Sequence, residues 1–299
     1  MRIASWIIVK GLPLVPKAIV GRVASRYVAG EKLEDALAVV EKLSAEGAMA
    51  TLDLLGEEVS ERSKATAAAD EYVRMLDAIA ARGLPSNVSI KLTSLGLKID
   101  AGFCQENVLR IVASAARHGN FVRIDMEDHS TTDRTLAIYR EVFARHQNVG
   151  VVFQAYMRRT LADIAALPRA GANVRLCKGI YIEPRTVAWK GYETVRLNFL
   201  EALEKLLTSG IYVGIATHDE HLACGAVALV DRLKVPRERY EFQMLYGVDP
   251  ELRRILLADG HRLRVYVPYG RDWYPYSTRR LRENPEVATH VLKGMFGAR

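Results

Sequence analysis

The chain alternates short apolar runs with longer stretches in which apolar residues recur at helical spacing. Leu33, Leu37, Val40 and Leu43 lie three or four positions apart with charged residues between them, and Gly47 follows as a stop signal. This spacing predicts an amphipathic helix. From position 48 onward, apolar runs rich in β-branched and aromatic residues alternate with helical patterns, which is typical of βα units.

Eight runs have the length and composition of strands, and enough chain separates them for a loop and a crossover helix. This arrangement predicts an α/β fold in which residues 48–299 form a closed (βα)8 TIM-type barrel and residues 1–47 form an N-terminal helical arm packed on it. An open doubly wound sheet is the alternative. The predicted strands are Ala48–Leu55, Val88–Leu92, Phe121–Met126, Val149–Ala155, Val174–Lys178, Tyr212–Ala216, Tyr240–Gln243 and Leu263–Val267.

Composition excludes several classes of protein. The 299 residues are 49% hydrophobic and 26% charged, which is ordinary globular usage and argues against disorder and coiled coil. Cys104, Cys177 and Cys224 lie far apart, so neither a disulfide framework nor a cysteine zinc site is indicated. We expect a reducing, cytoplasmic compartment, and charged residues in the first twenty positions argue against a signal peptide or spanning helix.

The first thirty residues are unusually basic. They hold five of the charges behind the net charge of +7, namely Arg2, Lys10, Lys17, Arg22 and Arg26, and contain no Asp or Glu. Such an arm could lie on an anionic membrane surface, contact nucleic acid, or be a solvated helix. Peripheral contact with the inner face of the cell membrane and a helix packed on the main domain both stay open, and we expect no binding of nucleic acid.

Polar residues stand at or near the end of every predicted strand. In a barrel of this type the chemistry lies at the carboxyl ends of the strands, so these side chains predict a polar mouth. A purely structural barrel has little reason to bring so many ionisable groups together, because each must be paired or desolvated. The residues are Asp53, Lys91, Asp125, Gln154, Arg175, Lys178, His218, Asp219, Gln243 and Tyr266.

A basic helix near the C-terminus offers an anion site. Tyr276, Arg279, Arg280 and Glu283 fall on one helical face, so two guanidinium groups could fork one carboxylate or phosphate. A solvated helix end is the alternative.

Two further groups could bind metal, although we expect no metal site. Asp125, Glu127 and Asp128 follow one strand and suit metal binding, proton transfer or pairing with Lys91. The sequence Thr217-His-Asp-Glu-His221 has a His-x-x-His spacing, although a histidine past a strand more often bonds a ligand or caps a helix.

The two lysines at strand ends, Lys91 and Lys178, also permit a Schiff-base lyase, which would need one of them neutral. No GxGxxG, GxxxxGK[ST] or GxSxG motif occurs, which argues against nicotinamide Rossmann enzymes, P-loop NTPases and common serine hydrolases.

Seven ordered motifs resemble the proline dehydrogenase family, starting near Ser89-Ile-Lys-Leu92 and continuing almost to the C-terminus. Each motif is weak alone, but their order is specific. They are Ile124-Asp-Met-Glu-Asp128, Gln154-Ala-Tyr156, Val174-Arg-Leu-Cys-Lys-Gly-Ile-Tyr181, Ala216-Thr-His218, Phe242-Gln-Met-Leu-Tyr-Gly247, Val265-Tyr-Val-Pro-Tyr-Gly270 and Tyr276-Ser-Thr-Arg-Arg280.

The resemblance implies a distorted (βα)8 barrel with extra N-terminal helices and bound FAD. It implies oxidation of L-proline to 1-pyrroline-5-carboxylate by hydride transfer from proline C5 to flavin N5, with electrons passed on to a membrane quinone. This reaction is the first step of proline degradation to glutamate. The chain resembles the monofunctional form, whose product goes to a separate 1-pyrroline-5-carboxylate dehydrogenase.

The resemblance also implies residue roles. Arg279 and Arg280 would bind the proline carboxylate, with Lys91, Tyr266 and Tyr276 completing the substrate pocket. Asp125 would hold neighbouring donors in place, and Arg175 would reach the flavin N5 region. The residues expected to contact the cofactor are Met126, Gln154, Arg175, Lys178, Gly179, Ile180, Thr217, His218, Gln243 and Tyr246. Many relatives carry alanine where Ile180 stands, and we expect the contact with the flavin to differ at this position.

Overall fold

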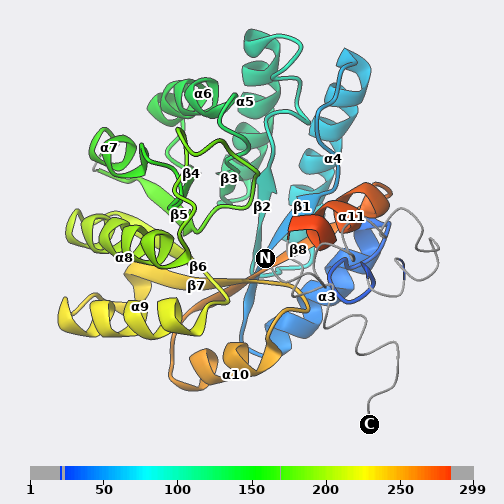
Figure 1. Ribbon diagram of the computed structural model, residues 1–299. Coiled ribbons are helices and arrows are strands. Elements are labelled where there is room, and N and C mark those ends of the chain that lie inside the picture. The colour runs from blue at the N-terminus through cyan, green and yellow to red at the C-terminus, as the bar shows by residue number, and fades with distance from the viewer. Residues whose placement is uncertain (1–20, 22–23, 169, 284–299) are drawn as a thin grey trace.

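Eight parallel strands close into a barrel in chain order, as Figure 1 shows. The computed structural model describes residues 21, 24–168 and 170–283. All eight predicted strands are present, so the closed barrel is confirmed and the open sheet was wrong. The strands are β1 (Met49–Leu54), β2 (Ser86–Ile90), β3 (Val122–Ile124), β4 (Val149–Gln154), β5 (Asn173–Cys177), β6 (Tyr212–Ala216), β7 (Tyr240–Leu245) and β8 (Leu263–Tyr269).

Helices surround the barrel, and their buried faces share one apolar core with the strands. Strand residues such as Leu52, Val88 and Ile124 are fully buried, because the strands are covered by helices on the outside and filled by side chains on the inside. The helices are α3 (Leu33–Ala45), α4 (Arg62–Ala81), α5 (Ala101–Arg117), α6 (Thr132–Arg145), α7 (Thr160–Ala165), α8 (Tyr192–Thr208), α9 (Glu220–Arg232), α10 (Pro250–Ala258) and α11 (Trp273–Glu283), with a 3-10 turn η2 (Arg237–Arg239).

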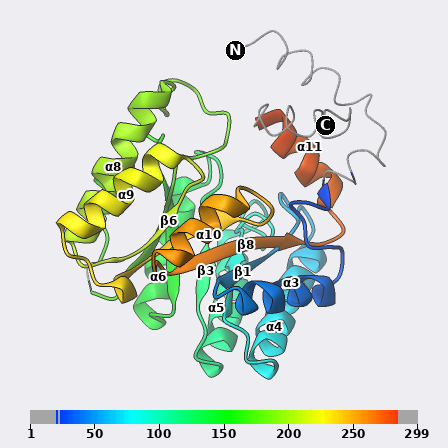
Figure 2. The same ribbon diagram turned by 90° about the horizontal axis from the view of Figure 1, so that it is seen from below.

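The barrel departs from regular alternation where it closes. Helix α3, which precedes the first strand, packs against β1 and β8, while α11, which follows the last strand, lies apart from the ring in Figure 2. Short backbone contacts join the two regions: Ala29 donates to the Pro268 carbonyl at 2.9 Å, and Gly270 donates to Gly30 at 2.9 Å. An N-terminal helix therefore takes the place on the ring that a helix after β8 would ordinarily fill.

Several residues expected at strand ends lie within strands instead. Arg175 is the third residue of β5, Gln243 is the fourth residue of β7, and Tyr266 is the fourth residue of β8. Hydrogen bonds across the barrel join these side chains to one another and to Asp125, so they point into the barrel. The prediction that they terminate strands was wrong, because the barrel interior here carries polar side chains in place of the usual branched apolar layers.

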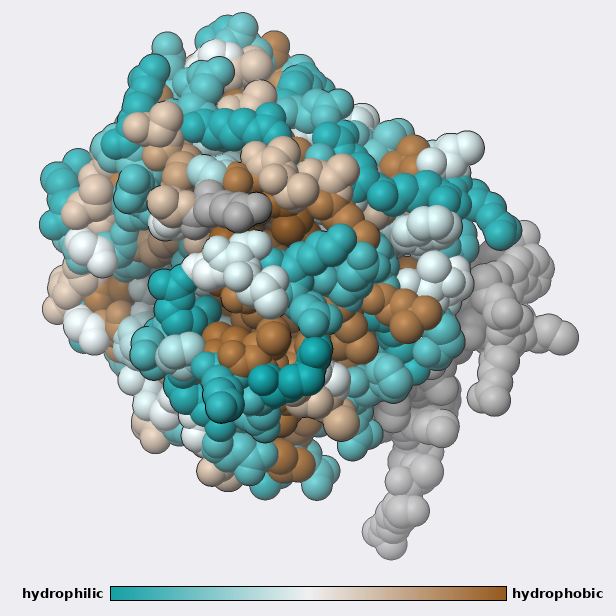
Figure 3. Space-filling view, turned by 90° about the vertical axis from the view of Figure 1, so that its left-hand side faces the viewer, coloured by the Kyte–Doolittle hydropathy of each residue, from teal (hydrophilic) through white to brown (hydrophobic). Residues whose placement is uncertain are grey.

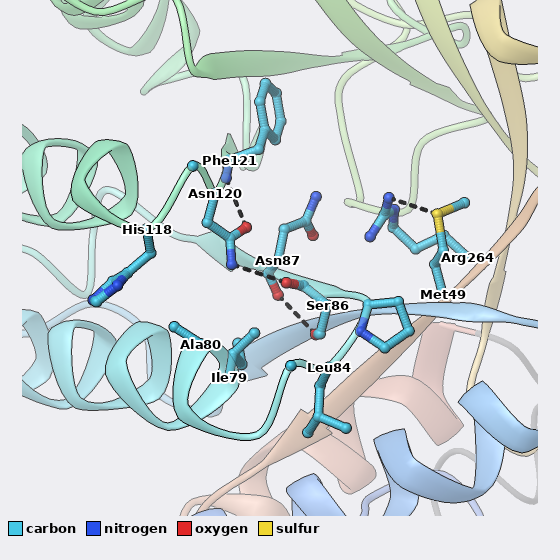
Figure 4. Close-up of a pocket in the computed structure, with 13 residues that line it drawn as sticks. Met49, Ile79, Ala80, Leu84, Ser86, Asn87, His118, Asn120, Phe121 and Arg264 are labelled. Carbon is cyan, nitrogen blue, oxygen red and sulfur yellow. Dashed lines mark hydrogen bonds between the residues drawn. The ribbon is translucent and has the colours of Figure 1, made fainter.

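A pocket of about 440 Å³ lies at the opposite, closed end of the barrel. Figure 4 shows Met49, Ser86, Asn87 and Arg264 on its wall, all at the amino ends of strands. This end of a (βα)8 barrel serves stability rather than chemistry. In this fold the chemistry belongs to the other end, where the strands have their carboxyl ends.

The outer surface gives no sign of a membrane span. Across the described ranges, no helix is both long and apolar enough to cross a membrane. The face in Figure 3, on the side where Figure 1 places α7, α8 and α9, mixes hydrophilic residues with scattered hydrophobic ones. Ile182 and Leu197 are exposed apolar residues, and such single residues are ordinary on a protein surface.

Candidate active site

Asp125 accepts three hydrogen bonds at the mouth of the barrel, directly after β3. Its Oδ1 accepts from Ser89 Oγ at 2.7 Å and from Arg175 Nη1 at 2.6 Å, and its Oδ2 accepts from the Tyr266 hydroxyl at 3.0 Å. The donors come from β2, β5 and β8. One carboxylate thus joins three separate strands, and the Arg175–Asp125 ion pair is largely buried.

Lys91 forms a second buried ion pair beside the first. Its Nζ lies 2.6 Å from Asp53 Oδ1 and 3.2 Å from the Tyr266 hydroxyl. Burial raises the pKa of Asp53 to about 6, although Lys91 opposes this rise. Burial alone would lower the pKa of Lys91, but the negative charges of Asp53 and Asp125 outweigh it and raise that pKa. The pair is therefore charged at neutral pH, and the direct partner of Lys91 is Asp53.

Arg175 is held from both sides. Its Nε donates to Gln243 Oε1 at 2.5 Å, while Nη1 bonds Asp125 and also reaches Ser89 Oγ at 3.2 Å. The guanidinium carbon lies 5.2 Å from the centre of the Tyr266 ring. Because every one of these partners is itself bonded, Arg175 presents a fixed positive charge at the mouth.

Three donors converge on Asp219, after β6. Arg196 Nη2 lies 2.7 Å from Oδ1, and the Tyr192 hydroxyl and Lys178 Nζ lie 2.8 and 3.1 Å from Oδ2. Burial alone would raise the pKa of Asp219, but these hydrogen bonds outweigh it and lower the pKa below its ordinary range. Lys178 is thus anchored beside the mouth by an ionised carboxylate.

Glu127 and Gln154 form the wall between β3 and β4. Glu127 accepts from the Thr93 amide at 3.0 Å and from Thr93 Oγ1 at 2.5 Å, and Gln154 Nε2 donates to the Glu127 carbonyl at 2.9 Å. Burial raises the pKa of Glu127 to about 7, so this carboxyl group titrates near neutrality. Met126, between Asp125 and Glu127, is buried.

The loops after β5 and β6 supply the remaining predicted cofactor residues. His218 Nε2 accepts from the Leu245 amide at 2.8 Å, which leaves the ring proton of neutral His218 on Nδ1. Thr217 Oγ1 accepts from the Asp219 amide at 3.0 Å. Ile180 and Tyr246 are half-buried, and Tyr246 donates its amide to the Tyr266 carbonyl at 2.9 Å.

Gly179 has a φ of +103°, and a Cβ there would lie 2.2 Å from the Tyr156 ring. The position requires glycine for both reasons. Bare backbone consequently faces Tyr156 between Lys178 and Ile180, where a side chain would not fit.

The carboxylate and histidine groups do not form a metal centre. Within the part of the chain that the structure describes, no three His, Cys, Asp or Glu side chains gather as metal ligands. Asp125 and Glu127 bond different partners, and Asp128 accepts from Ser130. The hypothesis of a His-x-x-His metal site also lacks support, because His218 Nε2 accepts a hydrogen bond from the Leu245 amide while His221 is exposed.

Helix α11 carries the predicted substrate residues Tyr276, Arg279 and Arg280. Tyr276 is buried in a small cluster with Val28 and Leu55. Leu55 directly follows β1, so this cluster places Tyr276 at the carboxyl end of the strands. Burial raises the pKa of Tyr266, and the neighbouring Asp125, Asp53 and Tyr276 add to that rise. Arg279 and Arg280 continue the helix, but their side chains lie outside the described residues.

Comparison with known proteins identifies the family. A family model described as proline dehydrogenase matches residues 36–293. The chain belongs to the proline dehydrogenase family. It is 40% identical to a proline dehydrogenase of Deinococcus radiodurans over 278 residues, covering 91% of this chain and 90% of the relative, and 39% identical to proline dehydrogenase 1 of Bacillus subtilis (strain 168) over 273 residues with the same coverage.

A solved structure shares the fold. The barrel resembles proline utilization A (PutA) from Bdellovibrio bacteriovorus, inactivated by N-propargylglycine, with a TM-score of 0.83 at 24% identity. The match covers 92% of this chain and 34% of that one. The family model and the two proline dehydrogenases described above confirm the family resemblance drawn from the seven motifs, and the chain is an enzyme of proline metabolism.

Family membership and geometry both argue against a Schiff-base lyase in this proline dehydrogenase. A Schiff-base lysine must be neutral, whereas the raised pKa of Lys91 keeps it charged against Asp53, and Lys178 is paired with Asp219.

Some site residues lie outside the set expected from the sequence. Ser89, which bonds both Asp125 and Arg175, stands two positions before Lys91 and so points to the same side of β2. Glu241 stands two positions before Gln243 on β7 and bonds it. Strand alternation was the available signal in both cases, but serine and glutamate in a strand do not by themselves indicate chemistry.

Proposed function

We propose that this proline dehydrogenase oxidises L-proline to 1-pyrroline-5-carboxylate with FAD bound at the mouth of the barrel. When bound, FAD supplies a hydride acceptor, which no amino-acid side chain provides. The observation that carries the proposal is the buried guanidinium of Arg175, fixed by Asp125 and Gln243. A fixed cation at this position favours negative charge that develops on a neighbouring acceptor.

The residues around Gly179 fit such a cofactor. A dinucleotide with a flavin ring requires cations for its phosphates, amide groups for its polar ring edge, and backbone that it can approach closely. Lys178 and Arg175 are cationic, Gln154 provides an amide, and Gly179 lets the loop between Lys178 and Ile180 pack closely on the Tyr156 ring beside them. The donor set is therefore suited to FAD.

Each cofactor residue is assigned by its place and its chemistry. Arg175 is assigned to the flavin N5 region and Gln154 to the pyrimidine edge. The other residues assigned to the cofactor are Met126, Lys178, Gly179, Ile180, Thr217, His218, Gln243 and Tyr246.

The substrate would be bound between the barrel mouth and α11. Arg279 and Arg280 are assigned to the proline carboxylate, because a pair of guanidinium groups suits a planar anion. Lys91, Tyr266 and Tyr276 complete the pocket. Asp125 acts by orienting Arg175, Ser89 and Tyr266, which supports catalysis by positioning rather than by proton abstraction.

The onward path of electrons and product is also proposed. Electrons pass to a quinone, and 1-pyrroline-5-carboxylate passes to a separate dehydrogenase. Residues 1–47 form an arm on the catalytic barrel of residues 48–299, and the basic positions before residue 21, which lie outside the described residues, would contact the inner face of the cell membrane of a cytoplasmic enzyme. The support is the charge pattern of that segment.

An anaerobic absorbance spectrum of the purified protein, taken before and after addition of L-proline, tests the proposal. We expect flavin bands that bleach with L-proline and persist with D-proline. Flavin bands that do not bleach with L-proline would contradict the assignment of L-proline as the substrate. A protein that takes up no FAD would contradict the assignment of FAD as the cofactor.

A further inference from the structure

Glu241 is a buried carboxylate one layer below the mouth. It lies on β7 with its side chain inside the barrel, where Arg264 Nε donates to Oε1 at 2.7 Å and the Tyr212 hydroxyl donates to Oε2 at 2.8 Å. Burial alone would raise its pKa, but Arg264 and the hydrogen bonds from Gln243 and Tyr212 outweigh burial and lower the pKa to about 2. Glu241 is therefore ionised at neutral pH.

The charge of Glu241 dictates which way the amide of Gln243 faces. Gln243 Nε2 donates to Glu241 Oε1 at 2.5 Å, and Gln243 Oε1 accepts from Arg175 Nε at 2.5 Å. An ionised carboxylate can only accept hydrogen bonds, so the NH₂ of the amide must face Glu241. The amide carbonyl then has to face Arg175, whose guanidinium can only donate.

Gly214 gives the amide the space that this orientation needs. In the strand register Gly214 is paired with Arg175 on β5 and with Glu241 on β7, so Gly214 faces the same side of the sheet as these two inward-pointing side chains. A Cβ at Gly214 would lie 2.5 Å from Gln243 Nε2 and 2.9 Å from its Cδ. The backbone of Gly214 has no positive φ, so side-chain packing accounts for the glycine.

We propose that Glu241 is a positioning residue for the reaction at the mouth: it fixes the Gln243 amide, which in turn fixes the guanidinium of Arg175. The inference rests on the proposed function, because Arg175 is the residue assigned to the flavin. The hydrogen bonds form a series that begins at Arg264, on the wall of the pocket in Figure 4. It continues through Glu241 and Gln243 and ends at Arg175.

A loss of orientation at Arg175 should be measurable in two ways. Small displacements of a positioning group reduce the rate of a reaction that depends on close approach, and a displaced cation stabilises the reduced flavin less. We expect the rate of flavin reduction at saturating L-proline to fall about tenfold. We expect the two-electron potential of the bound flavin to fall by about 30 mV, which corresponds to a tenfold change for two electrons.

Three variants interrupt this series of hydrogen bonds at different points. Glu241→Gln removes the charge that orients the amide, Gln243→Met removes the amide itself, and Gly214→Ala displaces it. Because Glu241→Gln leaves Arg264 buried without its partner charge, that variant is also the one that folding could penalise. Gln243→Met and Gly214→Ala keep the Glu241–Arg264 pair and test the inference independently.

Tyr212→Phe is the matched control. It removes a hydrogen bond to the same carboxylate, but on Oε2, which Arg264 Nη2 still contacts at 3.1 Å. We expect its rate of flavin reduction and its potential to match those of the unaltered enzyme.

A double-mutant cycle separates positioning from general loosening of the barrel. If Glu241 acts through Gln243, the variant Glu241→Gln/Gln243→Met should be no slower than the slower single variant. In the double variant, rate losses that multiply and shifts in potential that add would overturn the inference. Single variants with unaltered rate and potential would also overturn it. Failure of the unaltered enzyme to take up FAD or to be bleached by L-proline would instead overturn the proposed function.

Discussion

Charged residues at the mouth are buried together with their partners, and this pairing sets their protonation. Lys91 with Asp53 and Arg175 with Asp125 lie at 2.6 Å with little exposed side-chain surface. A buried charge without a partner costs several kcal/mol, whereas a paired and hydrogen-bonded one is tolerated. At the residue scale, the site is therefore a set of fixed charges whose arrangement depends on every member.

Glu127 gives a pH-dependent prediction. Its pKa is raised by burial from 4.5 to about 7, so the folded protein binds this proton more tightly than the unfolded chain. The resulting stability is fully present below about pH 4.5 and is lost as the pH rises through about 7. Relative to Glu127→Gln, which cannot ionise, the unaltered protein should lose about 3 kcal/mol of unfolding free energy across that range.

Urea unfolding at pH 4.5, 6 and 8 measures this difference. The exposed variant Glu201→Gln serves as control, since its surface ion pair with Lys205 should contribute well under about 1 kcal/mol at each pH. A constant difference between Glu127→Gln and the unaltered protein at all three pH values would contradict the raised pKa.

The arginine pair on α11 gives a kinetic prediction. Replacing Arg279 or Arg280 by methionine keeps an unbranched, flexible side chain but removes the charge and the hydrogen-bond donors. Since a charge-assisted hydrogen bond is worth about 1.5–3 kcal/mol, the KM for L-proline should rise about ten- to hundredfold while FAD stays bound. Steady-state kinetics with a dye acceptor check this. The exposed Arg254→Met on α10 is the control, and an unchanged KM in both test variants would reject the carboxylate assignment.

At the scale of elements, the helix before the first strand, α3, occupies the place on the ring that sequence order would give to α11, the helix after the last strand. Helix α3 packs on β1 and β8 and buries Leu33, Leu37 and Val40 in the main core. Helix α11 instead lies apart from the ring (Figure 2), and its Tyr276 packs with Val28 and Leu55. The consequence is that the N-terminal helix, and not a helix after β8, completes the ring of helices around the barrel.

Leu37→Ala tests the structural part of α3. Leu37 is 1% exposed, and truncating a fully buried leucine costs about 2–5 kcal/mol because the lost contacts leave a cavity. Chemical denaturation should show this loss, together with a lower melting temperature. Lys42→Ala, on the exposed side of the same helix, should change stability by less than about 0.5 kcal/mol. Equal effects of the two variants would show that α3 is not part of the cooperative core.

At the scale of the whole molecule, charge is distributed unevenly along the chain. The first twenty residues contribute Arg2, Lys10 and Lys17 and no acidic residue. The segment from Val28 to Gly30 already belongs to the folded part, because it contacts Tyr276 and the end of β8. Any test of the basic arm must therefore leave these residues in place.

Replacing Arg2, Lys10 and Lys17 together by glutamine tests membrane contact without shortening the chain. Each basic residue near an anionic surface is worth about 1 kcal/mol, so binding to vesicles containing phosphatidylserine should weaken about hundredfold. Co-sedimentation measures the binding, and dye-coupled activity should be unaltered. A control protein in which glutamine replaces Lys205, Arg232 and Lys234 has the same net charge as the test variant. Equal losses of vesicle binding in the two proteins would reject a specific role for the arm.

The sequence alone was sufficient to predict the local pattern of this protein. The eight strand runs, the helix beginning at Leu33 and the seven family motifs are readable because hydrophobic periodicity and motif order are properties of neighbouring residues. These features led to the closed barrel and to the family. They also brought most polar residues to the correct end of the barrel.

The tertiary structure alone decided which of those residues touch. Lys91 bonds Asp53, 38 positions away, and Arg175 bonds Asp125, 50 positions away. Ser89 and Glu241 join this network although neither residue type by itself indicates chemistry within a strand. Strand register and closure of the barrel set the height of each side chain, and neither is encoded in the spacing along one strand. The place of α3 beside β8 likewise depends on long-range packing.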